Sequence, residues 1–230
     1  NFIKKENKDN YKNLTNTRIN FQSLIFENLE FEYNKNKKIL DRASFHINKG
    51  EIIGIYGASG TGKSTFLNIL MGYLNIQNGK ILLNGELQNE YSSMIQDTAV
   101  YLSQKPFLIN STVLNNIALA IDPKEINFDK LYKSLEISGL SNINPDVKNL
   151  LNTEIGENGS KISFGQKQRI IIARSIYFDR ELLVMDESTS SLDNFSENQI
   201  LKSISAYKTK LSIIIISHNE TIKKYCDRVY

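Results

Sequence analysis

The sequence predicts an α/β fold: a parallel-sheet core with an N-terminal antiparallel β subdomain and an inserted helical subdomain. Strands that are apolar throughout alternate with helical segments, which is typical of a parallel sheet. Residues 24–33 partly alternate between apolar and polar side chains, as a half-buried strand does, whereas residues 112–151 carry apolar side chains at helical spacing. We expect a linker over residues 1–22 and one domain over residues 23–230, with the helical subdomain at about residues 106–176.

Composition narrows the class of protein. The formal net charge is only +3, from 28 basic and 25 acidic side chains, so the total charge implies no strong attraction to polyanions. The single cysteine, Cys226, excludes an internal disulfide framework and fits a reducing compartment. The longest aliphatic run, residues 213–216, falls far short of the roughly 18 apolar residues that span a bilayer. We therefore expect the chain itself to be soluble.

The first half of the predicted core begins with an apolar strand at residues 51–56, which leads into a glycine-rich loop and a helix at residues 63–73. Residues 79–87 predict a hairpin that turns at Asn84-Gly85, a pair that accepts positive φ. Residues 99–102 predict another short strand.

The second half of the core follows the helical insertion. Residues 164–177 and 195–205 predict helices, and residues 182–185 and 211–217 predict buried strands. This alternation of strand and helix is the basis for expecting a parallel sheet.

The glycine-rich loop matches the phosphate-binding pattern G-x-x-x-x-G-K-[ST] and lies between a predicted strand and a predicted helix, as the pattern requires. Its glycines let backbone N–H groups close around a β-phosphate, and the helix N-terminus adds partial positive charge. We expect Lys63 to bridge the β- and γ-phosphate oxygens and Ser64 to bind Mg²⁺ through its hydroxyl. The ATP-binding residues predicted here are Gly57, Ala58, Ser59, Gly60, Thr61, Gly62, Lys63, Ser64 and Thr65.

Two carboxylates follow the aliphatic run at residues 182–185. The carboxyl ends of strands are where ligands bind in open α/β sheets, so Asp186 and Glu187 are expected at such a site. We expect Asp186 to hold Mg²⁺ through water and Glu187 to orient or deprotonate the water that attacks ATP. Together with the phosphate loop, this pair predicts the hydrolysis of Mg·ATP.

A third segment, residues 162–169, resembles the signature sequence of the ATP-binding cassette (ABC) family, whose members have a P-loop NTPase fold of the RecA-like type. The resemblance runs from about Ile25 to Tyr230. Ser163 and Gln166 predict a capping box, and thus a helix N-terminus suited to a γ-phosphate. The resemblance implies that Ser163, Gly165 and Gln166 contact ATP on the phosphate loop of an opposing cassette. It also implies a working homodimer or heterodimer that encloses two nucleotides.

Other positions match the family in the same order along the chain. Tyr33 resembles its adenine-stacking residue, and Gln104 its glutamine that senses Mg²⁺ and the attacking water. Asp193 resembles part of the loop that couples the two sites, and His218 the histidine that contacts γ-phosphate. Taken alone, these residue types are more often structural. The resemblance thus implies the catalytic residues Lys63, Gln104, Glu187 and His218, and the Mg²⁺ ligands Ser64, Gln104 and Asp186.

Residues 107–117 and 153–159 resemble segments of exporter cassettes, the second of which touches the membrane domain. The resemblance therefore implies a nucleotide-binding domain whose transmembrane domain is fused before residue 1. Its expected place is the cytoplasmic face of a membrane, most simply the bacterial inner membrane.

Phe164 departs from the family, which usually has glycine at this position. A Cβ resists positive φ, and a benzyl group beside a phosphate site is bulky. We expect this chain to hydrolyse ATP at its own phosphate loop while offering a partner a weaker signature.

Two other readings remain open at this point. A soluble ABC-type ATPase that acts on ribosomes or DNA would share every nucleotide-contacting residue. The single cassette and the absence of coiled-coil arms or a basic stripe argue against it, so no nucleic acid is expected as a partner. A P-loop kinase of small molecules would leave the signature and His218 without a role.

Overall fold

A central parallel sheet organises the protein. The computed structural model describes residues 20–34, 37–89, 91–103, 105–186 and 194–230. Within them five strands pair in the order β6-β7-β8-β3-β9, and every pairing is parallel. The strands are β3 (Ile52–Tyr56), β6 (Ala99–Leu102), β7 (Leu182–Asp186), β8 (Ser212–Ser217) and β9 (Arg228–Val229). The predicted parallel sheet is confirmed, and β9 adds an edge strand that the sequence analysis missed.

The second sheet is antiparallel and has the order β2-β1-β4-β5. Its strands are β1 (Ser23–Glu32), β2 (Lys38–Asn48), β4 (Asn78–Leu83) and β5 (Glu86–Leu87). The predicted hairpin is confirmed, with positive φ at both Asn84 (54°) and Gly85 (83°). Strand β2 was not predicted, because Arg42 takes a positive φ of 50° and the irregular register around it breaks the alternation of buried and exposed side chains.

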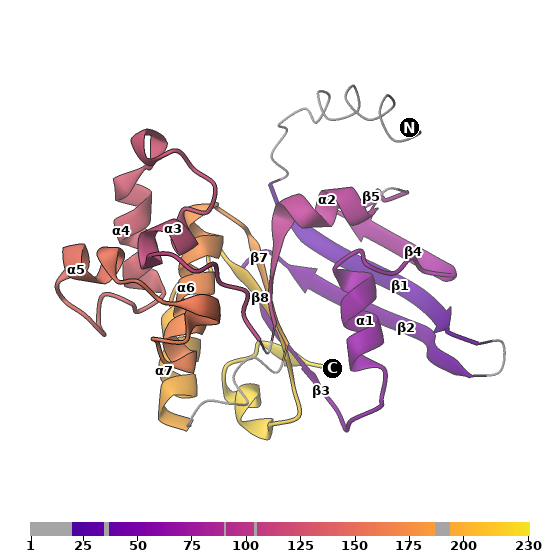
Figure 1. The fold of residues 1–230 in the computed structure, drawn as a ribbon. Coiled ribbons are helices and arrows are strands. Elements are labelled where there is room, and N and C mark those ends of the chain that lie inside the picture. Colours follow the sequence, from indigo (N-terminus) through magenta and orange to yellow (C-terminus); the bar gives the residue numbers. More distant parts are fainter. Residues whose placement is uncertain (1–19, 35–36, 90, 104, 187–193) are drawn as a thin grey trace, which may run out of the picture.

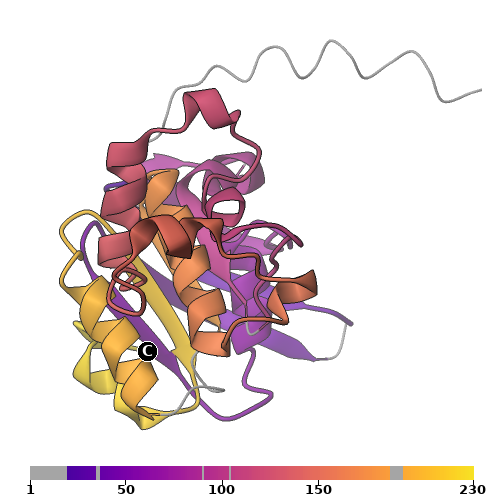
Figure 2. The ribbon, with the colours of Figure 1, turned by 60° about the vertical axis from the view of Figure 1, so that its left-hand side comes forward.

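The parallel sheet is the middle layer, with the antiparallel sheet on one side and most helices on the other (Figures 1 and 2). Alternate side chains of β8 show how the layers meet. Ile214 and Ile216 pack into the core shared with the antiparallel sheet, whereas Ile213 and Ile215 pack into the core shared with the helices. Side chains alternate across a strand, so a strand buried on both faces must be apolar throughout.

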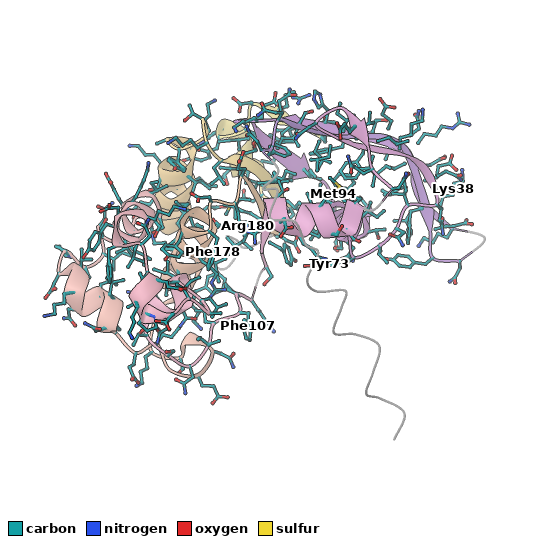
Figure 3. All side chains as sticks on the ribbon, turned by 90° about the horizontal axis from the view of Figure 1, so that it is seen from above. Lys38, Tyr73, Met94, Phe107, Phe178 and Arg180 are labelled. Carbon is teal, nitrogen blue, oxygen red and sulfur yellow. The ribbon has the colours of Figure 1, made fainter. Side chains whose placement is uncertain are left out.

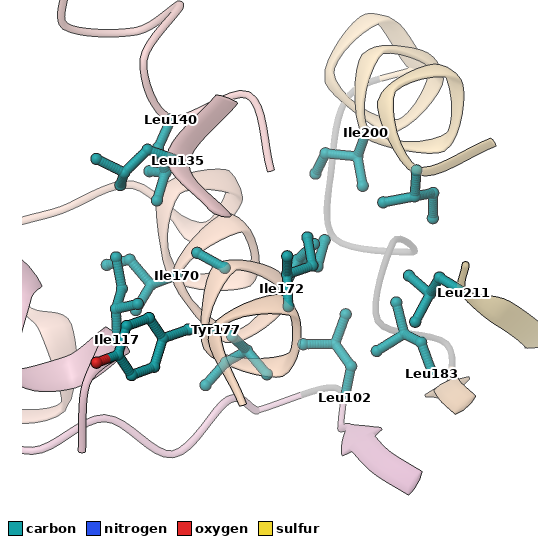
Figure 4. Close-up of a cluster of buried hydrophobic side chains, with 14 of the residues drawn as sticks. Leu102, Ile117, Leu135, Leu140, Ile170, Ile172, Tyr177, Leu183, Ile200 and Leu211 are labelled. Atoms are coloured by element: carbon teal, nitrogen blue, oxygen red, sulfur yellow. The ribbon is translucent and has the colours of Figure 1, made fainter. Parts of the chain in front are cut away.

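The helical side begins with the insertion predicted at residues 112–151. Its helices are α3 (Val113–Ile117), α4 (Phe128–Ile137) and α5 (Val147–Asn152), and α6 (Phe164–Tyr177) and α7 (Asn194–Ser205) follow them. Short 3₁₀ turns lie at η1 (Pro123–Glu125), η2 (Glu157–Gly159) and η3 (Glu220–Lys224). Buried side chains of α6, among them Ile170 and Ile172, fill the space between the insertion and the sheet (Figure 4). None of the helices in the described ranges is long and apolar enough to cross a bilayer.

Two helices lie on the side of the antiparallel sheet, α1 (Lys63–Leu70) and α2 (Tyr91–Thr98) (Figure 1). The ring of Phe66 in α1 packs edge-on against Phe26 of β1 and Phe45 of β2, with centroid distances of 5.6 and 5.2 Å. The prediction that α1 extends to residue 73 is wrong. The helix ends before Gly72, which takes a positive φ of 72°. Gly72 also packs closely on α2, because a Cβ added to Gly72 would lie 2.6 Å from the Cα of Ser92.

Parallel pairing brings the carboxyl ends of several strands to one edge of the sheet. Tyr56, the last residue of β3, pairs with Ser217, the last residue of β8. Asp186 ends β7 beside them and pairs with Ile216. The segments that follow these strands therefore start from a common edge, where ligands bind in open α/β sheets.

Candidate nucleotide-binding site

The loop between β3 and α1 holds its shape through glycine at two positions with positive φ. Gly60 has a φ of 84° and Gly62 one of 98°. Space is open around Gly60, so its backbone conformation alone favours glycine there, whereas a Cβ at Gly62 would also press against Ile39, 3.1 Å away. No side chain caps the start of α1, and its first turn has no acidic residue. The N–H groups of this helix end are thus available to an anion.

The ammonium of Lys63 lies across this loop. It donates to the carbonyl oxygens of Gly57, at 2.7 Å, and Ala58, at 2.8 Å. The hydroxyl of Thr61 donates to the same Ala58 oxygen at 3.0 Å. A positive charge is thereby held at the mouth of the loop by two neutral acceptors, which a phosphate oxygen can replace with a charge-assisted bond.

A cavity of about 400 Å³ opens at this edge of the sheet. The described residues that line it are Ile39, Ser59, Gly60, Gly62, Lys63, Ser64, Thr65 and Asp186. Six of the nine predicted loop residues and the first predicted carboxylate therefore meet at one cavity. Ile39 was missed, because nothing in its sequence context marks it, and it reaches the cavity only through the pairing of β2 with β1.

The cavity fits Mg²⁺ by the chemistry of its donors. Ser64 supplies a hydroxyl and Asp186 a carboxylate, and oxygen ligands are those that Mg²⁺ prefers. Within the described parts of the chain, no cluster of three or more His, Cys, Asp or Glu residues could hold a metal ion. A sparse site of this kind suits a metal that takes one or two protein oxygens and completes its shell with phosphate and water.

A smaller hollow of about 150 Å³ lies at the opposite, amino ends of the strands. Lys49 and Glu181, which line it, form an ion pair at 2.9 Å. No glycine is among its described lining residues, so the hollow lacks the loop N–H groups that the cavity beside Lys63 offers to an anionic ligand.

Tyr33 stands beside the cavity with its ring open to solvent. Its hydroxyl lies 3.3 Å from the hydroxyl of Thr65, and its ring packs edge-on against Phe31 at 5.0 Å. Tyr33 is nevertheless 58% exposed. A ring held by two contacts but still exposed can stack on a flat base such as adenine.

Asp186 has a partner that the sequence analysis did not identify. The hydroxyl of Tyr101, on the neighbouring strand β6, donates to Asp186 Oδ2 at 2.8 Å. Burial, and then this hydrogen bond to the carboxylate, raise the pKa of Tyr101 well above its usual value. No local sequence signal could have revealed the contact, because it depends on the adjacency of β6 and β7.

The signature segment forms the N-terminus of α6. The predicted capping box is present: Gln166 N donates to Ser163 Oγ at 3.3 Å, and Ser163 N donates to Gln166 Oε1 at 2.8 Å. Among the described residues, Ser163, Gly165 and Gln166 do not line the cavity beside Lys63. One chain thus presents a phosphate loop and a capped helix end as separate features.

Phe164 is the first residue of α6 and takes no positive φ. The expectation that a side chain with a Cβ would strain the backbone here is therefore wrong, because the capping box lets the helix start at this residue. The half-buried benzyl group remains beside the helix N-terminus.

His218 follows β8 directly and is exposed at the same sheet edge. The turn after it is fixed by Asn219, whose side chain accepts from Thr221 N at 3.1 Å. His218 does not line the cavity as the described residues define it. Gln104, Glu187 and Asp193, the other predicted catalytic and coupling residues, lie outside the described residues.

The two exporter-like segments lie side by side. Thr112 and Glu154 form an antiparallel bridge, and Ile155 N donates to Ser111 O at 3.1 Å. Arg174 of α6 fastens the first of these segments by donating from Nε to Asn116 O at 2.7 Å, and burial lowers the pKa of Arg174 to about 10. The signature helix and the paired segments are therefore joined.

Comparison with known proteins identifies this arrangement. Residues 40–190 match the family described as ABC transporter. An ATP-dependent lipid A-core flippase of Ralstonia nicotianae is 34% identical over 209 residues, which are 90% of this chain and 35% of the flippase. A probable ABC transporter ATP-binding/permease protein of Haemophilus influenzae is 34% identical over 204 residues, 88% of this chain and 36% of its own length. The chain thus spans about a third of the length of these curated relatives.

A solved structure of an ABC exporter also resembles this chain. The structure of a bacterial Atm1-family ABC exporter with ATP bound superposes with a TM-score of 0.78 at 28% sequence identity. The match covers 92% of this chain and 37% of the exporter chain.

Proposed function

This chain belongs to the ABC transporter family, and we propose that it is the ATP-hydrolysing motor domain of an exporter. The observation that carries the proposal is the cavity where the glycine loop, Lys63, Ser64 and Asp186 meet. A cation, an uncapped helix N-terminus and two oxygen donors in one cavity suit a nucleoside triphosphate bound with Mg²⁺. Some of the similar proteins are named as flippases or exporters, which supports export or flipping of a substrate as the process that ATP hydrolysis drives.

Binding would use contacts that the free protein already prepares. The ammonium of Lys63 would leave the carbonyls of Gly57 and Ala58 for the β- and γ-phosphate oxygens. The first N–H groups of α1 would donate to the same phosphates. The exposed ring of Tyr33 would stack on adenine, with Thr65 holding its hydroxyl.

Ser64 and Asp186, together with Gln104, would hold Mg²⁺. The ion supplies positive charge that offsets the charge on the transferring phosphate. In this proposal Glu187 takes the proton of the attacking water, and His218 contacts the γ-phosphate from the carboxyl end of β8. The chain thus contributes positioning and charge stabilisation, which dominate phosphoryl transfer.

A second cassette is part of the proposal. The N-terminus of α6 is capped and ready for a phosphate, yet Ser163, Gly165 and Gln166 are apart from the cavity of their own chain. We infer that they contact the γ-phosphate of ATP held by a partner cassette, in a homodimer or heterodimer. Asp193 would connect the two sites.

A transmembrane domain is the other proposed partner, fused to the cassette as the name of the Haemophilus influenzae ATP-binding/permease protein suggests. Phe107, labelled in Figure 3, supports a docking surface at the two paired segments, since this large apolar residue is 68% exposed. The bond from Arg174 to Asn116 would link movement there to α6. The cassette would then lie on the cytoplasmic face of a membrane, in bacteria the inner membrane.

Light scattering on the Glu187→Gln variant tests the paired arrangement. Without the catalytic base, bound ATP should persist and hold two copies together, so adding Mg·ATP should double the mass. The matched control adds Lys63→Met, which should stay monomeric because it lacks the phosphate-binding ammonium. A Glu187→Gln sample that binds ATP and keeps the mass of one chain would contradict a homodimer. The heterodimer alternative would then be tested by mixing the variant with a second, different cassette and measuring whether Mg·ATP doubles the mass.

A further inference from the structure

Asp186 is supported unequally by its two neighbouring strands. On one side its backbone pairs with Ile216 of β8. On the other side β6 pairs with β7 only as far as Leu102, which lies opposite Met185. The side chain of Tyr101 reaches past this end of the pairing, and its hydroxyl binds Asp186 Oδ2 at 2.8 Å. On the β6 side a half-buried side chain therefore supports this carboxylate where the strand pairing has ended.

We propose that Tyr101 is a positioning residue for Mg²⁺: by holding Asp186 Oδ2 it fixes the carboxylate so that Oδ1 serves the metal's coordination shell. The inference rests on the function proposed above and concerns the same cavity. Asp186 lines that cavity together with Ser64, whereas Tyr101 is not among its described lining residues. Tyr101 thus acts through Asp186 and does not touch the ligand.

A phenol is well suited to this task. It donates one hydrogen bond and carries no charge, so it orients the carboxylate without competing electrostatically with a cation. A lysine or arginine at the same place would pair with Asp186 and oppose Mg²⁺ binding. Tyr101 is half-buried, which limits the rotamers open to its ring. Partners that orient a metal's ligands typically change metal affinity by about 10- to 100-fold when removed.

The test compares Tyr101→Phe with the unmodified chain by titrating a fluorescent ATP analogue. Each protein is titrated with Mg²⁺ present and again with EDTA, and then Mg²⁺ is titrated at fixed nucleotide. Tyr101→Phe should raise the half-saturating Mg²⁺ concentration by about 10-fold or more. Affinity for the analogue in EDTA should stay unchanged, because the phosphate loop itself is intact.

Tyr91→Phe is the matched control. Tyr91 is a buried tyrosine of α2 whose hydroxyl donates to Leu70 O. Its loss should lower the melting temperature without moving the Mg²⁺ midpoint. A double-mutant cycle with Asp186→Asn isolates the proposed route, since Tyr101→Phe should add no further change in that background.

Three results would overturn the inference. The first is a folded Tyr101→Phe variant with an unchanged Mg²⁺ midpoint. The second is a Tyr101→Phe variant that loses as much affinity for the analogue in EDTA as it does with Mg²⁺. The third is a Tyr101→Phe effect on the Mg²⁺ midpoint that is as large in the Asp186→Asn background as in the unmodified chain. If the unmodified chain itself shows no gain in affinity from Mg²⁺, the proposed function fails as well. A failure confined to Tyr101→Phe leaves that function intact.

Discussion

Lys63 shows how one residue prepares the site before a ligand arrives. Its ammonium satisfies two loop carbonyls, so the charge is stabilised while the loop keeps its curvature. Phosphate oxygens are stronger acceptors because they are ionised. The exchange of partners should therefore favour the bound state, and this side chain should contribute measurably to the affinity for the triphosphate.

Lys63→Met should weaken ATP binding roughly 10- to 100-fold, since hydrogen bonds to charged groups contribute about 1.5 to 3 kcal/mol. Equilibrium titration with a fluorescent ATP analogue measures the change. Lys80→Met, which removes an exposed lysine of β4, is the control and should bind as the unmodified chain does. Equal affinities for the two variants would exclude Lys63 from phosphate binding.

At the scale of elements, α6 is the clearest case of structure foreseen from sequence. Its bounds, Phe164–Tyr177, are those predicted, because a capping box and a helical apolar period mark the same residues. Strand β2 carries no comparable pattern, since Arg42 interrupts it. Tyr101 and Asp186 are 85 residues apart in the chain and come into contact only when their two strands become neighbours, which no local pattern encodes.

Ser163→Ala should destabilise the protein by about 1 kcal/mol, because the N–H of Gln166 loses its acceptor at the start of α6. For a chain of this size that corresponds to a melting temperature lower by roughly 2 to 4 °C. Ser163→Asn keeps a side-chain acceptor and should melt close to the unmodified protein in the same thermal scan. Similar losses for both variants would show that capping is not what the serine contributes to stability.

At the scale of the molecule, the parallel sheet gathers residues that the sequence scatters. The loop after β3, Asp186 at the end of β7 and His218 after β8 reach one edge because the strands run in the same direction. The predicted order of strands and helices was enough to foresee that edge. Ile39 and Tyr101 could not be foreseen, because they join the site through packing between strands.

Asp227, just before β9, should make the stability of the protein depend on pH in the acidic range. Asp227 accepts from Ile52 N at 2.9 Å and from Lys208 Nζ at 3.0 Å, and the backbone bond is the main cause that lowers the pKa of Asp227 below its ordinary 3.8. Its contribution is therefore present above that value and is lost as the pH falls through the lowered pKa. Thermal scans should show a constant stability gap between the unmodified chain and Asp227→Asn from about pH 6 to 5, and a gap that closes as the pH falls below about 4.

Asp41→Asn is the control for this pH series, because Asp41 is an exposed aspartate on β2 with a lysine partner, Lys38. The difference in stability between Asp41→Asn and the unmodified protein should be small at every pH, because surface ion pairs contribute little to stability. A gap for Asp227→Asn that stays constant across the range would contradict the role assigned to its ionised form.

Phosphate release at saturating Mg·ATP tests whether Glu187 is the base with which this cassette hydrolyses ATP. The unmodified chain should release phosphate, and Glu187→Gln should release it roughly 10²- to 10⁴-fold more slowly while it retains its affinity for ATP. Equal rates for the two proteins, or no release by the unmodified chain despite bound Mg·ATP and dimer formation, would contradict this role of Glu187.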